Sequence, residues 1–239
     1  MSLARVTALL VVVGCGNTQP PPPAPEFPAG TTPSDGLVET VRALQVRMHQ
    51  RYEASRRVER AIVFGDLERA REEARTIVSL EERDVLPAWR PSFEAVREAA
   101  RAVDEAPDLE TAARRTGTLG TRCMECHVAS KARIVIPVRD QPPAGGRLGP
   151  QMQGHEWAAL AMWDGLVAPS DEHWQRGAAL LADVRSDMVA HESFDVAARM
   201  KATATSAVSA PRGERGELYG NLLASCARCH STLRDGITR

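Results

Sequence analysis

Two copies of one short cysteine motif constrain this chain more than any other feature. C-M-E-C-H occupies residues 123–127 and C-A-R-C-H occupies residues 226–230 of a sequence of 239 residues. In each copy a Gly-x-Leu begins six positions before the first cysteine, at Gly117 and at Gly220. Because the same spacing precedes both motifs, an internal duplication explains the chain better than coincidence does.

The duplication extends back to the start of each copy. Met48 lies 75 residues before Cys123, and Met152 lies 74 residues before Cys226. Between these points apolar residues recur at spacings of three and four, which is typical of helices with one buried face. Aromatic residues make up only 4% of the chain, a composition that disfavours strands. The pattern therefore predicts helices throughout both copies.

We expect an all-α fold of two tandem antiparallel four-helix bundles, each with its motif on its last helix. Stretches rich in proline precede the first copy and separate it from the second, and such stretches favour extended linkers. The predicted organisation is a signal peptide over 1–14, a tether over 15–35, a first unit over 36–131, a linker over 132–150 and a second unit over 151–239.

The motif itself predicts covalent attachment of haem. On a helix, cysteines at i and i+3 and a histidine at i+4 project from one face. Such a face presents two thiols to the vinyl groups of haem and one imidazole to its iron. We therefore expect two haem c groups, with thioether bonds to Cys123, Cys126, Cys226 and Cys229 and with proximal iron ligands His127 and His230.

Two other chemistries use paired cysteines. An all-cysteine zinc site could combine both pairs, but a separation of about 100 residues on two helices matches zinc ligand spacing poorly. A thioredoxin-type redox pair needs a strand–helix–strand pattern, which neither motif has. The remaining histidines His173 and His191 are interpreted as surface residues.

A four-helix unit with Cys-x-x-Cys-His on its last helix resembles the cytochrome c′ / cytochrome c556 family. The resemblance covers both units, each about 95 residues long. It implies an antiparallel bundle with haem in its core and with the distal iron position filled from the first helix. In smaller cytochromes c, by contrast, the motif lies near the N-terminus.

Candidates for the distal ligand follow from that expectation. In the second unit His155 and Met152 lie three positions apart on one apolar stripe, and either could reach iron. In the first unit the candidates are Met48, which the repeat aligns with Met152, and His49. The repeat aligns Arg51 with His155, so the two haem sites are expected to differ.

The N-terminus resembles an export signal. The apolar run over 6–13 is far too short to cross a bilayer. The sequence Val-Val-Gly-Cys ending at Cys15 resembles the lipobox of bacterial lipoproteins, which implies lipidation of the Cys15 sulfur. An ordinary signal peptide that contains a cysteine is the alternative. Both interpretations predict export, and a lipid anchor would hold the protein on a membrane surface, facing the periplasm.

These features together predict an electron carrier. Two haem groups joined by a short linker form a relay, and a sixth ligand would close each iron to substrates. A gas-binding or sensor protein with an open distal site is the alternative, whereas the late motifs disfavour a di-haem peroxidase. No catalytic constellation stands out. Lys and Arg number 30 against 31 Asp and Glu, which gives no reason to expect nucleic acid. The expected partners are redox proteins and, through Cys15, a membrane.

Overall fold

The regular secondary structure of the chain is helical wherever it is described. The computed structural model describes residues 35–80, 85–140, 148–183 and 194–237, and the prediction of an all-α fold is confirmed within these ranges. Eight α-helices occur there: α1 (Asp35–Val63), α2 (Leu67–Ser79), α3 (Arg90–Asp104), α4 (Leu109–Ala129), α5 (Leu148–Val167), α6 (Asp171–Ala182), α7 (Phe194–Ala207) and α8 (Arg215–Ile237). We call α1–α4 the first half and α5–α8 the second half.

The second helix of each half begins at a side-chain cap that the sequence signals. Asp66 caps α2, where its carboxylate accepts a hydrogen bond from the Arg69 amide at 3.0 Å. Ser170 caps α6 in the same way, with its hydroxyl 3.4 Å from the His173 amide. Such caps satisfy backbone N–H groups that the first turn leaves without a partner. Gly65, with φ of 74°, makes the turn between α1 and α2.

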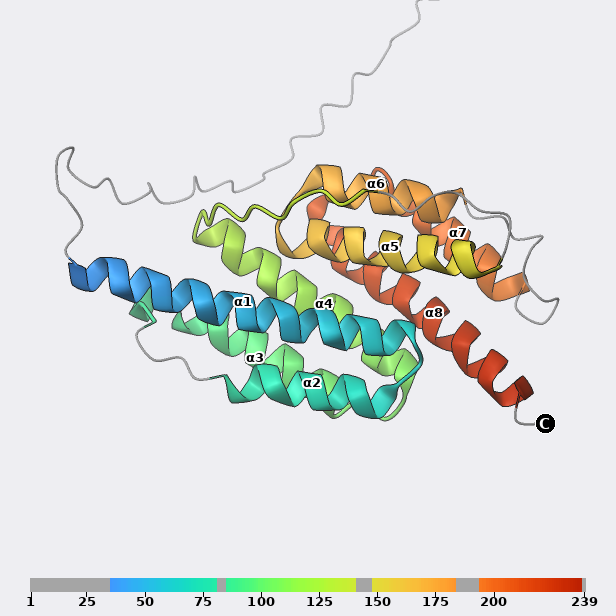
Figure 1. Cartoon of the computed structure of the whole chain (residues 1–239), viewed down its shortest axis with the longest axis horizontal. Helices are drawn as coiled ribbons and strands as arrows, with labels where there is room; N and C mark the ends of the chain where they lie inside the picture. The colour runs from blue at the N-terminus through green and yellow to red at the C-terminus, as the bar shows by residue number, and fades with distance from the viewer. Residues whose placement is uncertain (1–34, 81–84, 141–147, 184–193, 238–239) are drawn as a thin grey trace, which may run out of the picture.

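Helices that are adjacent in the sequence pack against each other within each half. The most extensive helix pair of the described residues, however, joins the two halves, because α4 packs along α8. Figure 1 shows these two helices running along the same diagonal through the middle of the molecule. The last helix of each half is therefore shielded from solvent by the other half.

Glycines allow α4 and α8 to approach to backbone contact. A Cβ atom built on Gly117 would lie 2.8 Å from the Gly220 nitrogen and closer still to the Gly216 carbonyl oxygen. A Cβ atom on Gly220 would lie 3.0 Å from the Arg114 Cα. Residue numbers rise along one helix as they fall along the other, so the pair is antiparallel. Gly117 and Gly220, which the repeat aligns, thus meet at the crossing.

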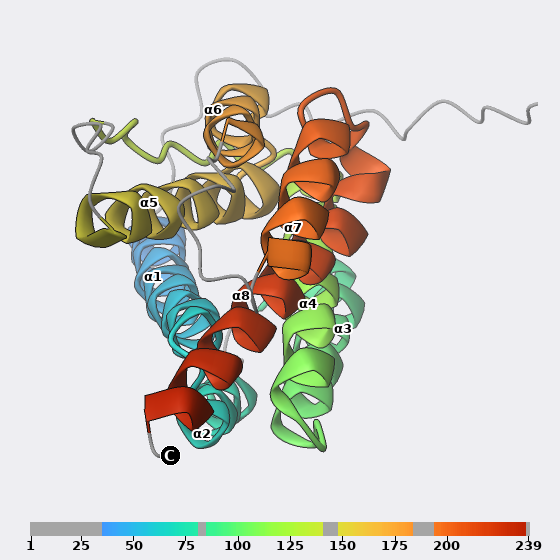
Figure 2. The same ribbon diagram turned by 90° about the vertical axis from the view of Figure 1, so that its right-hand side faces the viewer.

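The first helix of each half also contacts the opposite half. α1 packs against α8 and α5, and α5 packs against α4; in Figure 2, α8 passes between α1 and α4. Hydrogen bonds join the halves, from Tyr52 Oη to Asp164 Oδ1 at 2.5 Å and from Tyr219 Oη to Glu59 Oε1 at 3.2 Å. The core is therefore continuous across both halves.

The predicted signal peptide and the predicted tether, including Cys15, lie outside the described residues, apart from Asp35, the first residue of α1. Among the helices that the structure describes, each is too short or too polar to span a lipid bilayer.

Candidate functional site

The second cysteine motif lines a cavity of about 250 Å³. Cys226, Cys229 and His230 reach it from α8. The rest of its lining is largely apolar: Ser225 of α8, Met152, Gln153, His155 and Glu156 of α5, Val196, Ala197 and Met200 of α7, Val63 of α1, and Phe64, which follows α1. The structure thus brings both predicted distal candidates of the second unit to the same cavity as the predicted proximal ligand.

His155 has a buried ring nitrogen, Nε2, that the described residues leave without a hydrogen-bond partner. Burial lowers the pKa of His155 to about 4, and the nearby His230 lowers it further in the same direction. The imidazole is therefore neutral at physiological pH, with a lone pair available to a metal. A buried polar atom of this kind calls for a partner, and iron would supply it.

His230 stands against the end of the first half. Its ring centroid lies 6.4 Å from that of Phe64, with the planes inclined at 52°. Phe64 follows the last residue of α1, so the first half forms one wall of the second site. Aromatic pairs at this separation attract each other through their edges and faces. The contact helps to fix the orientation of His230.

The first motif has a corresponding support from the second half. His127 Nδ1 lies 2.6 Å from the backbone carbonyl oxygen of Val167, the last residue of α5. Because a carbonyl can only accept, Nδ1 carries the proton and Nε2 keeps the lone pair. Histidine ligands commonly have their other ring nitrogen held in this way. The tautomer is therefore the one that a proximal ligand bonded through Nε2 requires.

The two supports are related by the internal repeat. The alignment that pairs Met48 with Met152 also pairs Val63 with Val167. Val63 lines the cavity of the second motif, and Val167 holds the histidine of the first. Each candidate site is thus completed by the end of the first helix of the opposite half. The equivalence of Val63 and Val167 is visible in the sequence. The sequence does not indicate that each of these helix ends lies beside the motif of the opposite half.

At the first candidate site, Arg51 has the position that His155 has at the second. It is 8% exposed, and its guanidinium carbon lies 4.8 Å from the ring centroid of Phe93. Burial raises the pKa of Cys123 and that of Cys126, and the charge of Arg51 opposes this rise, so Arg51 lies near both thiols. An arginine is always protonated and does not bind iron. The two sites therefore differ in chemistry at matched positions.

The distal candidates of the first unit lie in different surroundings. His49 is exposed in a groove of about 680 Å³ between α1 and α2, together with Gln50 and Leu80. It is two residues from Arg51, which puts the two side chains roughly 200° apart around the helix. The structure therefore does not bring His49 to Cys123. Met48 is half-buried and, being three residues from Arg51, shares its side of α1.

The four motif cysteines are free of disulfide bonds. Burial raises the pKa of Cys123 and that of Cys226 to about 12, so these two thiols are neutral at physiological pH. Reactive cysteines have lowered pKa values, so these two do not have the surroundings of a thiol–disulfide redox pair. Within the described ranges no group of three or more His, Cys, Asp or Glu residues could hold a metal ion by itself.

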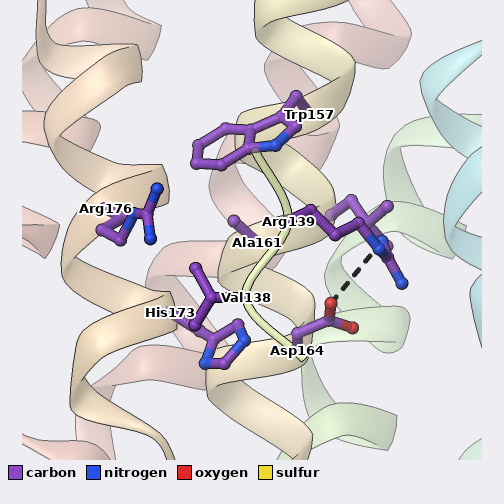
Figure 3. Close-up of a pocket in the computed structure, with 8 residues that line it drawn as sticks. Val138, Arg139, Trp157, Ala161, Asp164, His173 and Arg176 are labelled. Atoms are coloured by element: carbon purple, nitrogen blue, oxygen red, sulfur yellow. Dashed lines mark ion pairs between the residues drawn. The ribbon is translucent and has the colours of Figure 1, made fainter. Parts of the chain in front are cut away.

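The prediction that His173 is a surface residue is wrong. Its side chain is 8% exposed, and its Nδ1 lies 2.9 Å from the Ser170 hydroxyl that caps α6. Figure 3 shows it beside Val138 and near Asp164, which forms an ion pair with Arg139 at 3.6 Å. The contact with the capping residue Ser170 holds the ring of His173 inside the protein. His173 is distant in sequence from both cysteine motifs. His191 lies outside the described residues.

Three groups around the sites were not identified from the sequence. Glu59 and Tyr219 are buried between the halves, and the Val167 carbonyl is a backbone atom. A glutamate on the apolar side of α1, between Val58 and Ile62, was the one available signal.

Comparisons with protein-family models, with curated proteins and with solved structures find no match.

Proposed function

We propose that this chain is a di-haem c-type cytochrome that relays electrons outside the cytoplasm. Each half is then a four-helix unit of the kind found in the cytochrome c′ / cytochrome c556 family. Haem supplies a one-electron couple between ferric and ferrous iron. The cysteines Cys123, Cys126, Cys226 and Cys229 are the thioether residues, and His127 and His230 are the proximal ligands. No catalytic residue is assigned.

One observation carries the proposal. His155 and His230 lie on different helices around one apolar cavity, and two thiols, Cys226 and Cys229, lie beside them. Covalent haem with two axial histidines uses all four side chains and satisfies the orphaned His155 Nε2. A disulfide or ordinary core packing would leave at least one of them unexplained. A zinc ion would need all four to converge on one point, and no group of three or more His, Cys, Asp or Glu residues in the described part of the chain does so.

The protein contributes orientation and exclusion of water. Val167 fixes the tautomer of His127, and Phe64 packs against His230. Met152 and Met200 add apolar surface around the second site, which would exclude water and so limit the rearrangement of solvent when the charge of iron changes. Met152 stays a candidate distal ligand, but a neutral histidine with an unused nitrogen is the better one.

The position of the motifs suits a relay. Cys123 and Cys226 lie on opposite sides of the α4–α8 crossing, because these helices are antiparallel and each cysteine follows its glycine by six residues. At 1.5 Å per residue the two cysteines are roughly 20 Å apart along the helix axes. Two centres at the ends of one rigid helix pair can accept and deliver electrons at different faces of the protein.

We also propose that the protein is an exported lipoprotein anchored through Cys15. The apolar run and the Val-Val-Gly-Cys sequence support this location, as does the requirement that haem c be attached outside the cytoplasm. Its partners would be redox proteins at the membrane surface.

A second function is favoured for the first site alone. Arg51 cannot bind iron, and it takes the position that His155 has in the other half. Unless Met48 supplies a sixth ligand, iron held by His127 would be open to small gases such as CO or NO. The first haem would then bind gas, while the second transfers electrons.

Mass spectrometry and visible spectroscopy test both functions. The protein is produced in cells that attach haem c, and its mass is expected to include two haem groups. In the reduced state, part of the spectrum is expected to stay low-spin under CO. His155→Ala should make that part respond to CO as well, because it removes the sixth ligand.

His173→Ala is the matched control, since His173 is equally a histidine of the second half but bonds to Ser170. The control should leave the CO response as it is in the wild type. A colourless product, or a mass without added haem, would refute the proposal. Low-spin bands that persist in His155→Ala would instead refute the assignment of His155.

A further inference from the structure

The carboxyl group of Glu59 is buried between the halves, and no ion pair of it with a cation occurs among the described residues. Glu59 of α1 is 4% exposed, and its Oε1 accepts a hydrogen bond from Tyr219 Oη at 3.2 Å. Glu73 is buried to the same extent, but it pairs with Arg57 at 2.7 Å and with Arg69 at 2.6 Å. Among the described residues a tyrosine, rather than an arginine, is thus the partner of Glu59. A charge that is buried without a counter-ion is costly, so the neutral acid is favoured.

Titratable and charged groups face Glu59 from three helices. They are Arg56 on its own helix, Glu156 and Asp164 on α5, and Tyr219 and Cys226 on α8. Burial is the largest influence and raises the pKa of Glu59 to about 8; the two carboxylates raise it, while Tyr219 and Arg56 lower it. Glu59 therefore binds and releases a proton close to neutral pH.

Glu59 is also close to the second site. Its charge raises the pKa of Cys226, one of the two cysteines there. Val63, one turn further along α1, lines the same cavity. A unit charge added at the second iron would act on a nearby buried carboxylate more strongly than it would in water. An added electron makes the negative form of Glu59 less favourable.

We infer that Glu59 is a proton-binding site coupled to the electron at the second haem, so that this half takes up a proton when it is reduced. The inference rests on the proposed function. In this step a reduced redox protein would supply one electron, and bound haem would supply its acceptor, the couple between ferric and ferrous iron. One proton leaves a hydronium ion or buffer acid in solution, and an O–H bond forms on the Glu59 carboxylate. The net charge of the interior is unchanged.

The coupling has a defined sign. Reduction raises the affinity of Glu59 for a proton, and by linkage protonation raises the affinity of the second haem for an electron. The reduction potential therefore falls as the pH rises through the range in which Glu59 loses its proton. At full coupling, the ratio of oxidised to reduced haem at a fixed applied potential changes about tenfold for each pH unit.

Spectroelectrochemical titration of the haem-loaded chain, from about pH 6 to about pH 10, tests the inference. One of the two reduction steps is expected to depend on pH, with a change approaching tenfold per pH unit. In Glu59→Gln this dependence should disappear, while haem content and spectra are retained. Glu73→Gln is the control, because it removes another buried glutamate whose partners are Arg57 and Arg69 and not a residue of α8; it should keep the dependence.

Two further measurements test the inference even if Glu59→Gln folds poorly. An infrared difference spectrum of reduced minus oxidised protein should contain the C=O band of a neutral carboxylic acid. Tyr219→Phe removes a hydrogen bond that lowers the pKa of Glu59, so the pH-dependent range should move upward. A wild-type protein with two reducible haems and no pH dependence would overturn this inference and leave the relay intact. A product without haem would instead overturn the relay itself.

Discussion

Replacing Gly117 by alanine tests whether the two halves are held together by backbone contact between α4 and α8. The new methyl group would lie 2.8 Å from the Gly220 nitrogen and closer still to the Gly216 carbonyl oxygen. Carbon atoms normally approach other heavy atoms to about 3.5 Å, so the helices would have to separate by roughly 1 Å. The obstructing atoms belong to the backbone of α8 and cannot rotate away.

Two opposing effects set the expected magnitude. Alanine favours a helix interior over glycine by about 1 kcal/mol. Overpacking of a well-packed contact costs typically about 1–3 kcal/mol, and a rigid obstacle puts this case at the upper end. We expect Gly117→Ala to lower the free energy of unfolding by about 2 kcal/mol. For a chain of this size that corresponds to a decrease in Tm of roughly 4–8 °C.

Gly154→Ala is the matched control. Gly154 also lies inside a helix, but the nearest atom to its added methyl would be Leu180 Cδ2 at 4.0 Å. This variant gains the helix propensity without the clash, so we expect its stability to rise by about 0.5–1 kcal/mol. Urea and thermal unfolding followed by far-UV circular dichroism would measure both variants. Equal stabilisation in the two variants would refute the close approach of α4 and α8.

Three more changes have defined outcomes. The pKa of Glu59 is raised to about 8, from about 4.3 in the unfolded chain, so its contribution to stability is complete below the unfolded value and is lost as the pH rises through about 8. Urea unfolding should find this loss of stability in the wild type but not in Glu59→Gln. The loss is at most a few kcal/mol, at about 1.4 kcal/mol per pKa unit. Arg51→His installs the residue of the second half in the first, and titration of the reduced protein with CO should then find the gas-sensitive fraction reduced at least several-fold; an unchanged response would contradict the alignment of the two distal positions. Phe64→Ala removes the ring against His230, and since Phe64 is 50% exposed we expect a loss of about 1–2 kcal/mol in thermal unfolding, together with a changed spectrum of one haem only; a spectrum identical to that of the wild type would mean that Phe64 does not support the second site.

The helices and their order could be predicted from the sequence because they depend on local signals. Apolar residues at spacings of three and four locate each buried face, and Asp66 and Ser170 begin α2 and α6 through hydrogen bonds only three residues long. The grouping of Cys226, Cys229 and His230 on one helix face is equally local. His155 could be proposed as a ligand from its place on the apolar stripe of α5 and from the repeat.

The contacts between the halves could not be predicted, because they depend on how whole helices cross. Nothing local distinguishes Gly117 as a contact with α8 from a glycine that merely weakens its helix. The bond from His127 to Val167 uses a backbone carbonyl, which any residue provides. His173 was misjudged for a related reason: its Nδ1 bonds to a cap residue, and the cap brings the ring inward. His49 has the right chemistry for a ligand, but it lies on the opposite side of α1 from Arg51.

The pseudo-twofold relation between the halves explains how two sites with one frame can differ. Gly117 and Gly220 are equivalent positions that meet each other, and Val63 and Val167 are equivalent positions that each support the opposite site. This reciprocity is what an isologous contact between two identical subunits would have. In such a dimer, however, both sites would carry the same residues. A fused chain frees each half to vary, and the variation falls on the distal side: Arg51 against Phe93 in one half, a neutral His155 with an unused nitrogen in the other. Because the frame is shared, a difference between the two haems in ligand binding or potential would arise from these few residues and their buried neighbours, not from the fold.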